Sequence, residues 1–119
     1  TDSEKHKWAT GVGNELILSN LKKLLETFPE LPVQVRTPVI PGFNDDETTL
    51  RNIARLTRKN GLKKHLLAQF SSICRDKYAQ IGLPFTYSRF ELAPEKMSAA
   101  IRIFEEEGLS TAVFPDLHY

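Results

Sequence analysis

The chain has 119 residues, which is enough for one domain with a core but far fewer than the roughly 250 of a closed eight-stranded βα barrel. Hydrophobic residues make up 40% of the sequence, charged residues make up 26%, and the formal net charge is +1. This average globular composition lacks the strongly basic surface of nucleic-acid binders, so we predict a single domain or fragment, residues 1–119, with no nucleic-acid partner.

The apolar stretches and the cysteine content bear on the compartment. No apolar stretch approaches the roughly 20 residues of a membrane-spanning helix, so we predict no membrane association. The single cysteine, Cys74, cannot form an internal disulfide, which is typical of a reducing compartment, and we expect a cytoplasmic protein. The chain begins without Met, so no secretory signal can be recognised and a gene start upstream of Thr1 stays open.

The first periodic segment predicts a helix over residues 15–28, with Asn14 as its N-cap. Its apolar side chains fall at spacings of three and four: Ile17, Leu21, Leu24, Leu25 and Phe28. Pro29 and Pro32 end this pattern. Residues 33–40 are rich in β-branched residues and bounded by Pro41-Gly42, which predicts a strand.

The same helix and strand order occurs twice more. Asp45 and Asp46 precede a helical segment that ends at Asn60-Gly61, and residues 62–70 follow as a strand. Pro94 suits a first helical turn, Gly108 closes that helix, and residues 109–114 form the last predicted strand. Helices alternating with short strands predict an α/β fold of parallel βα units with right-handed crossovers.

Two further features concern the segment between the second and third units and the completeness of the sheet. Residues 71–93 show no clear periodicity, and we interpret them as a lid or docking loop. Three strands cannot close a barrel, and a parallel sheet needs both faces covered, so we expect a missing part upstream. An uncovered apolar surface of this kind can also drive self-association.

The candidate binding residues lie on and after the strands. Strand alternation puts Arg36 on one face of the strand and Val35 and Thr37 on the other. In a βα barrel, the strand face away from the helices lines the lumen, and we expect Arg36 on that face. Arg36 is therefore a candidate to hold an anionic group such as a carboxylate, and the alternative is a structural pair with Asp45 or Asp46. Gln69 ends the next strand, where a functional contact and plain solvent exposure are equally good interpretations.

Other residues give weaker signals. The turn from Pro41 to Asp46 is explained by local shape, through an Asx cap onto the next helix. Lys77 and Tyr78 suit either a partner contact or an exposed charge beside a packed aromatic. His6, His65 and His118 show no metal-ligand spacing and Cys74 lies in no nucleophile motif, so we predict no metal and no catalytic residue in this chain.

Several segments resemble the glycyl radical enzyme activating enzymes, the family that includes pyruvate formate-lyase activating enzyme. The most specific is VRTPVIPGFND at residues 35–45, similar to the family's IR-PLIPGYND. The other matching segments are Asp2, His6, Thr10-Gly11-Val12-Gly13-Asn14, Ile17-Leu18, Asn20-Leu21, Leu66-Leu67, Lys77-Tyr78 and Ile81-Gly82. The match runs from Asp2 to about Gly108.

This resemblance implies the carboxyl-terminal part of a partial, six-stranded βα barrel. It also implies a parent reaction in which a 4Fe-4S cluster reductively cleaves S-adenosylmethionine and the resulting radical takes hydrogen from a glycine of a partner glycyl radical enzyme. The family's C-x3-C-x2-C loop, its glycine-rich segment and an Asp-x-Lys strand end would precede Thr1. We therefore expect this chain alone to bind no cofactor and to be inactive.

Residue by residue, the resemblance implies that Arg36 is the strand arginine facing the barrel interior, and that Asn44 and Asp45 form the turn after it. The chain departs from the family where a histidine normally contacts S-adenosylmethionine, because Phe70 takes that place. Gln69 is the candidate substitute, and residues 71–76 fit the family poorly. The competing hypothesis is a stand-alone, non-catalytic α/β module that binds a partner protein through residues 71–93.

Overall fold

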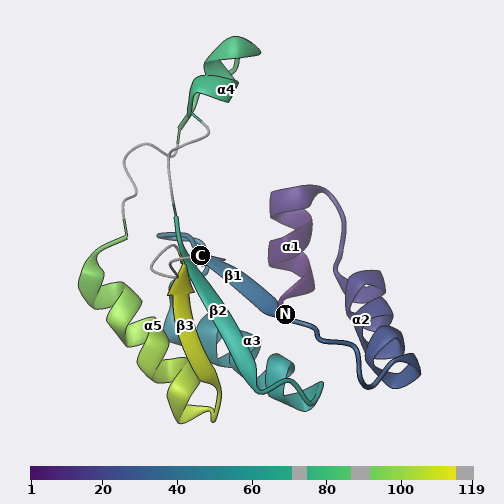
Figure 1. Ribbon diagram of the computed structural model, residues 1–119. Helices are drawn as coiled ribbons and strands as arrows, with labels where there is room; N and C mark the ends of the chain where they lie inside the picture. Colours follow the sequence, from purple (N-terminus) through teal and green to yellow (C-terminus); the bar gives the residue numbers. More distant parts are fainter. Residues whose placement is uncertain (71–74, 87–91, 115–119) are drawn as a thin grey trace.

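The computed structural model describes residues 1–70, 75–86 and 92–114 (Figure 1). Its elements in chain order are α1 (Ser3–Thr10), α2 (Glu15–Thr27), β1 (Val35–Val39), α3 (Glu47–Lys59), β2 (Lys64–Gln69), α4 (Arg75–Gln80), α5 (Pro94–Glu106) and β3 (Ser110–Phe114). The three strands form one parallel sheet in the order β1-β2-β3. The predicted α/β class with parallel strands is confirmed.

The predicted helices and strands agree with the observed ones to within two residues at each end. Two helices were not predicted. Asp2 caps α1 by accepting a hydrogen bond from the Lys5 backbone N–H at 3.0 Å, and α4 lies inside the long segment interpreted as a loop. Asn14 is the N-cap residue of α2, as predicted, although its side chain makes no capping hydrogen bond.

Helices α3 and α5 cover one face of the sheet. Thr37 and Val39 of β1 are buried on this face, as is Leu67 of β2, the register partner of Thr37. The core cluster there comprises Val39, Leu50, Ala54, Leu67, Leu92, Ala100, Ile103, Phe104 and Leu109. The strand alternation predicted for β1 is therefore confirmed.

The remaining helices lie outside this core. In Figure 1, α1 and α2 stand on the β1 side of the sheet and α4 extends away from the strands. Neither α1 nor α2 contains a fully buried residue. No helix in the described part of the chain is long and apolar enough to cross a membrane.

Candidate functional site

Arg36 lies on the face of the sheet opposite α3 and α5. Its register partner is Leu66, and Leu66 pairs in turn with Ala112. We call this surface, formed by Arg36, Pro38, Leu66, Ala68 and Ala112, the Arg36 face; Leu66, in its centre, is 1% exposed. Arg36 is exposed, and among the described residues its hydrogen bond is from Nε to Gln34 Oε1 at 3.2 Å.

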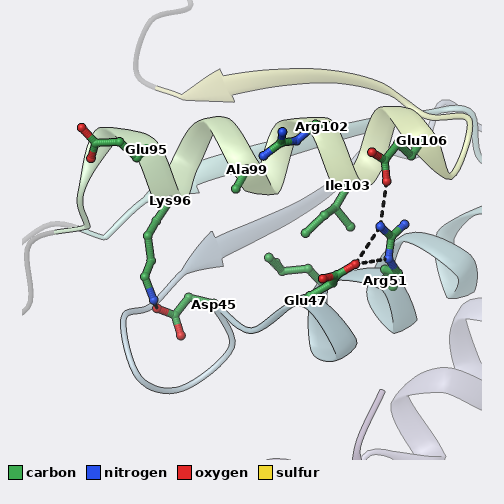
Figure 2. Close-up of a pocket in the computed structure, with 10 residues that line it drawn as sticks. Asp45, Glu47, Arg51, Glu95, Lys96, Ala99, Arg102, Ile103 and Glu106 are labelled. Atoms are coloured by element: carbon green, nitrogen blue, oxygen red, sulfur yellow. Dashed lines mark hydrogen bonds and ion pairs between the residues drawn. The ribbon is translucent and has the colours of Figure 1, made fainter.

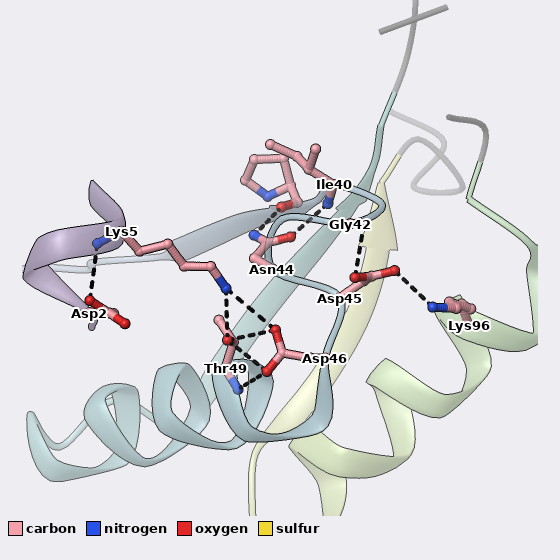
Figure 3. Close-up of polar contacts among 10 residues, drawn as sticks. Asp2, Lys5, Ile40, Gly42, Asn44, Asp45, Asp46, Thr49 and Lys96 are labelled. Atoms are coloured by element: carbon pink, nitrogen blue, oxygen red, sulfur yellow. Dashed lines mark hydrogen bonds and ion pairs between the residues drawn. The ribbon is translucent and has the colours of Figure 1, made fainter. Parts of the chain in front are cut away.

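The loop from β1 to α3 is held by two side chains of the PGFND segment (Figure 3). Asn44 is buried, and its Nδ2 donates to the Pro38 carbonyl at 2.8 Å while its Oδ1 accepts from the Ile40 N–H at 2.7 Å. Asp45 accepts from the Gly42 N–H at 3.0 Å and from Lys96 Nζ of α5 at 3.0 Å. These groups fix the shape of the loop at the carboxyl end of β1.

Asp46 has a separate structural role, as the N-cap of α3. Its Oδ2 accepts from the Thr49 N–H at 2.9 Å, and this hydrogen bond is the main cause of the lowered pKa of Asp46. Lys5 of α1 lies 3.5 Å from Asp46 Oδ1 and donates to Thr49 Oγ1 at 3.3 Å (Figure 3). Both aspartates that could have paired with Arg36 bind other cations instead.

Gln69 is exposed at the end of β2, but the structure does not bring it to the Arg36 face. Its register partner is Val39, which points into the core, so strand alternation puts the two candidate binding residues on opposite sides of the sheet. The next residue, Phe70, falls in the same alternation as Arg36. Phe70 also takes the place of the histidine expected from the family resemblance.

A pocket of about 440 Å³ lies between α3 and α5, in the helical layer (Figure 2). Leu50 and Ile103 contribute apolar lining, and ion pairs cross it at both ends. Lys96 binds Asp45 at 3.0 Å at one end, and Arg51 binds Glu106 at 2.7 Å at the other. Its lining includes neither candidate binding residue.

His65 forms a buried polar cluster that the sequence did not reveal. It is 2% exposed, and its Nε2 lies 2.8 Å from Thr37 Oγ1 while its Nδ1 lies 3.1 Å from Thr57 Oγ1. The ring packs on Phe104 at a centroid distance of 4.6 Å. The sequence could not reveal this cluster, because the two threonines lie on other elements and meet the inward-facing His65 only when β1, α3 and β2 are packed together.

The other residues considered as ligands or partner contacts have local roles or lie outside the description. His6 Nδ1 lies 2.7 Å from the Val12 carbonyl, and Tyr78 packs edge-on against Phe85 at 5.2 Å. Lys77 is exposed. Cys74 and His118 lie outside the described residues. Within the described ranges, no three His, Cys, Asp or Glu side chains are grouped to hold a metal ion.

Comparison with known proteins identifies relatives among activating enzymes. The chain is 40% identical to the (2S)-3-sulfopropanediol sulfolyase activating enzyme of Bilophila wadsworthia over 99 residues, covering 83% of the chain and 31% of the relative. It is 54% identical over 66 residues to the isethionate sulfite-lyase activating enzyme of Nitratidesulfovibrio vulgaris, covering 56% and 22%. With the 4-hydroxyphenylacetate decarboxylase activating enzyme of Clostridioides difficile strain CD196, identity is 34% over 113 residues, covering 94% and 36%.

A solved structure shares the fold. The crystal structure of a domain of pyruvate-formate lyase-activating enzyme from Bacteroides vulgatus matches with a TM-score of 0.69 and 23% identity, over 95% of this chain and 61% of that one. No family model matches the sequence. The chain spans about a third or less of the length of the curated relatives quoted above. Over that part of their length, it is homologous to the glycyl radical enzyme activating enzymes.

Proposed function

We propose that the chain is the carboxyl-terminal part of a glycyl radical enzyme activating enzyme, whose parent reaction cleaves S-adenosylmethionine to make a glycyl radical on a partner enzyme. The homology to such enzymes over most of this chain and a minor share of theirs supports this proposal. In it, the Arg36 face is the interior surface of a partial βα barrel. The class of glycyl radical enzyme that serves as partner stays open.

The observation that carries the proposal is the exposure of Arg36 and the absence of an ion pair with either nearby aspartate. It is an exposed cation on a strand, on the face that α3 and α5 do not cover, and it pairs with neither Asp45 nor Asp46. Within the part of the chain that the structure describes, the hydrogen bond of Arg36 is made by Nε, which leaves the Nη groups for two parallel hydrogen bonds to a carboxylate. The amino acid carboxylate of S-adenosylmethionine fits this donor, and we assign Arg36 to it. Gln69 remains a weaker proposal, because it alternates to the other side of the sheet.

The iron-sulfur cluster does not fit the residues of this chain. Three cysteine thiolates would be required, and the sequence has one cysteine. The described residues likewise offer no cluster of ligating side chains. The proposal therefore assigns cluster ligation to another part of the parent enzyme and none of it to these residues.

The test uses a joined polypeptide in which the amino-terminal part of the Nitratidesulfovibrio vulgaris relative precedes Thr1, loaded anaerobically with iron and sulfide. We expect Arg36→Gln to raise the Kd for S-adenosylmethionine at least about tenfold, because a charged bidentate contact is lost. Arg36→Lys should give a smaller increase, since the charge stays but the fork geometry does not. Equilibrium dialysis with labelled S-adenosylmethionine measures both.

Arg102→Gln is the matched control, because Arg102 is an exposed arginine on α5, in the lining of the pocket between α3 and α5. We expect it to leave the Kd unchanged. An unchanged Kd for Arg36→Gln, in a protein with the melting temperature of the unsubstituted one, would reject the assignment of Arg36.

A second candidate function is a partner-binding module acting through residues 71–93. The observation that favours it is α4, which extends away from the sheet with Ile81 and Leu83 exposed beyond its end (Figure 1). Shortening this segment should then abolish capture of a partner by the chain alone. Unaltered capture would count against this function.

A further inference from the structure

Trp8 of α1 is 77% exposed, more than any other large apolar side chain in the described part of the chain. Its ring stacks on the ring of Phe43, with the two centroids 6.0 Å apart and the planes inclined by 29°. This single ring contact leaves most of the indole in solvent. We call the rings of Trp8 and Phe43 the aromatic platform. Its geometry is that of an attractive offset pair of aromatic side chains.

The aromatic platform is held in place from both of its elements. The Phe43 N–H donates to the Ile40 carbonyl at 3.1 Å, within the loop that Asn44 ties to the end of β1. Lys5 reaches from α1 to this loop (Figure 3), where its Nζ lies 5.5 Å from the centroid of the Phe43 ring and 3.5 Å from Asp46 Oδ1. A surface that is ordered before binding loses less conformational entropy when a partner docks on it.

The aromatic platform lies at the end of the sheet where a βα barrel has its active site. Phe43 belongs to the loop that follows the carboxyl end of β1, and Lys5 contacts Asp46 and Thr49 at the start of α3. Active sites of βα barrels are built from the loops at the carboxyl ends of the strands. The proposed reaction takes hydrogen from a glycine of another protein, so that protein has to approach this end of the sheet.

The chemistry of the aromatic platform suits an apolar side chain of a polypeptide. Lys5 is paired with Asp46, and the two acidic residues Asp2 and Glu4 balance Lys5 and Lys7 along α1, so no net charge favours an ionic ligand. Tryptophan is enriched among the few residues that dominate binding energy at protein interfaces. A purely structural role, in which Trp8 holds α1 on the loop, would use only the part of the ring that faces Phe43.

We infer that the aromatic platform is a docking point for the glycyl radical enzyme partner, and that it contacts an apolar side chain of the polypeptide segment that carries the reacting glycine. This inference rests on the proposed function and deepens it, because it assigns partner recognition to Trp8 and Phe43. Other occupants of the same surface are the polypeptide that precedes Thr1 and a second copy of the chain. The experiment separates these three occupants.

The experiment uses the joined polypeptide described above and two probes, isethionate sulfite-lyase and (2S)-3-sulfopropanediol sulfolyase, for which two of the relatives are named as activating enzymes. We expect Trp8→Ala to raise the Kd for the enzyme that binds at least about tenfold, and Trp8→Phe to raise it less. Phe28→Ala is the matched control, because Phe28 is an exposed aromatic at the other end of the α1–α2 segment, and its Kd should be unchanged. Biolayer interferometry measures each Kd.

Hydroxyl-radical footprinting of the unsubstituted joined polypeptide provides a second measurement that needs no variant to fold. Oxidation is followed at single residues by peptide mass spectrometry. Binding of the enzyme should lower the oxidation rate of Trp8 at least about tenfold, because water is excluded from the centre of an interface, and should leave that of Phe28 unchanged. Equal oxidation of Trp8 with and without the bound enzyme overturns the inference, and so does the absence of binding to both enzymes.

The remaining outcomes identify the other occupants. Trp8 that is already protected in the joined polypeptide without an enzyme partner would show that the preceding polypeptide covers it. Protection that appears only as the concentration of the joined polypeptide rises would show that a second copy covers it. Either result overturns the inference.

The inference and the proposed cofactor contact can fail separately. Binding of S-adenosylmethionine that depends on Arg36, together with enzyme binding that ignores Trp8→Ala, rejects the docking point alone. Enzyme binding that depends on Trp8, with no effect of Arg36→Gln on the Kd for S-adenosylmethionine, supports the docking point and rejects the assignment of Arg36.

Discussion

At the scale of single residues, His65 shows how a polar ring is accommodated in this core. The Thr57 hydroxyl donates to the Ile53 carbonyl at 3.0 Å, so it can only accept from His65 Nδ1. Nε2 then accepts from the Thr37 hydroxyl. Both nitrogens of the neutral ring are thus hydrogen-bonded, and burial, which disfavours the charged form, lowers the pKa of His65 to about 4.

This lowered pKa predicts an acid-sensitive stability. The unfolded histidine has a pKa of about 6.5, so below that pH the unfolded state takes up a proton before the folded state does. The stabilisation is complete above pH 6.5 and is lost as the pH falls toward 4. Between pH 7.5 and 5.0, urea denaturation should show a loss of about 2 kcal/mol in the free energy of unfolding.

The comparison variants isolate the contribution of His65. His65→Leu should be less stable at pH 7.5 by about 1 to 3 kcal/mol, because Thr37 loses its buried partner, but should lack most of the loss between pH 7.5 and 5.0. His6→Gln, at a histidine outside the core, should keep that loss. A His65→Leu variant with the same pH dependence as the unsubstituted chain would show that another group is responsible.

At the scale of elements, α3 and α5 are joined by a charged clamp beside their apolar contact. Arg51 of α3 binds Glu47 at 2.8 Å, Glu106 at 2.7 Å and Glu107 at 3.2 Å, and Arg55 binds Glu107 at 3.1 Å. The Glu106 and Glu47 hydrogen bonds raise the pKa of Arg51. Glu107 is 16% exposed, and the hydrogen bond from Arg55 lowers its pKa.

A network of this kind should contribute more than an isolated surface pair. We expect Arg51→Met to lower the Tm by several degrees at low salt and by less at high salt, where ion pairs are screened. Lys22→Met is the control, because the Lys22–Glu26 pair is 3.8 Å apart with both side chains largely exposed. Differential scanning calorimetry at two salt concentrations checks this, and equal Tm shifts in the two variants would contradict it.

The elements also show what the sequence could predict. Helices with an apolar stripe, such as α3, and strands between turn residues were predicted because periodicity and Gly or Pro signals mark them. Helix α1 escaped prediction because its one large apolar side chain, the exposed Trp8, cannot form an apolar stripe of the kind that marked α2. Helix α4 has only six residues, too few for a periodic pattern.

At the scale of the whole molecule, the sequence could predict on which face of the sheet a strand's side chains lie. It could not predict which residues of the other strands lie beside them. Alternation within β1 put Arg36 opposite Thr37, as observed. The pairing of Val39 with Gln69 depends on the strand register, which no local pattern specifies, so the separation of Gln69 from Arg36 became visible only in the assembled sheet. The fixed loop after β1 likewise depends on Lys96, which lies on α5, remote in sequence.

The partial sheet is the basis of the central claim, that the chain is the carboxyl-terminal part of an activating enzyme. The most direct test is to read the coding DNA immediately upstream of Thr1. We predict an open reading frame that encodes roughly one hundred or more further residues and contains a C-x3-C-x2-C loop. With this chain, that length approaches the about 250 residues of a closed βα barrel. A start codon at or just before Thr1 would contradict the claim and favour a stand-alone module.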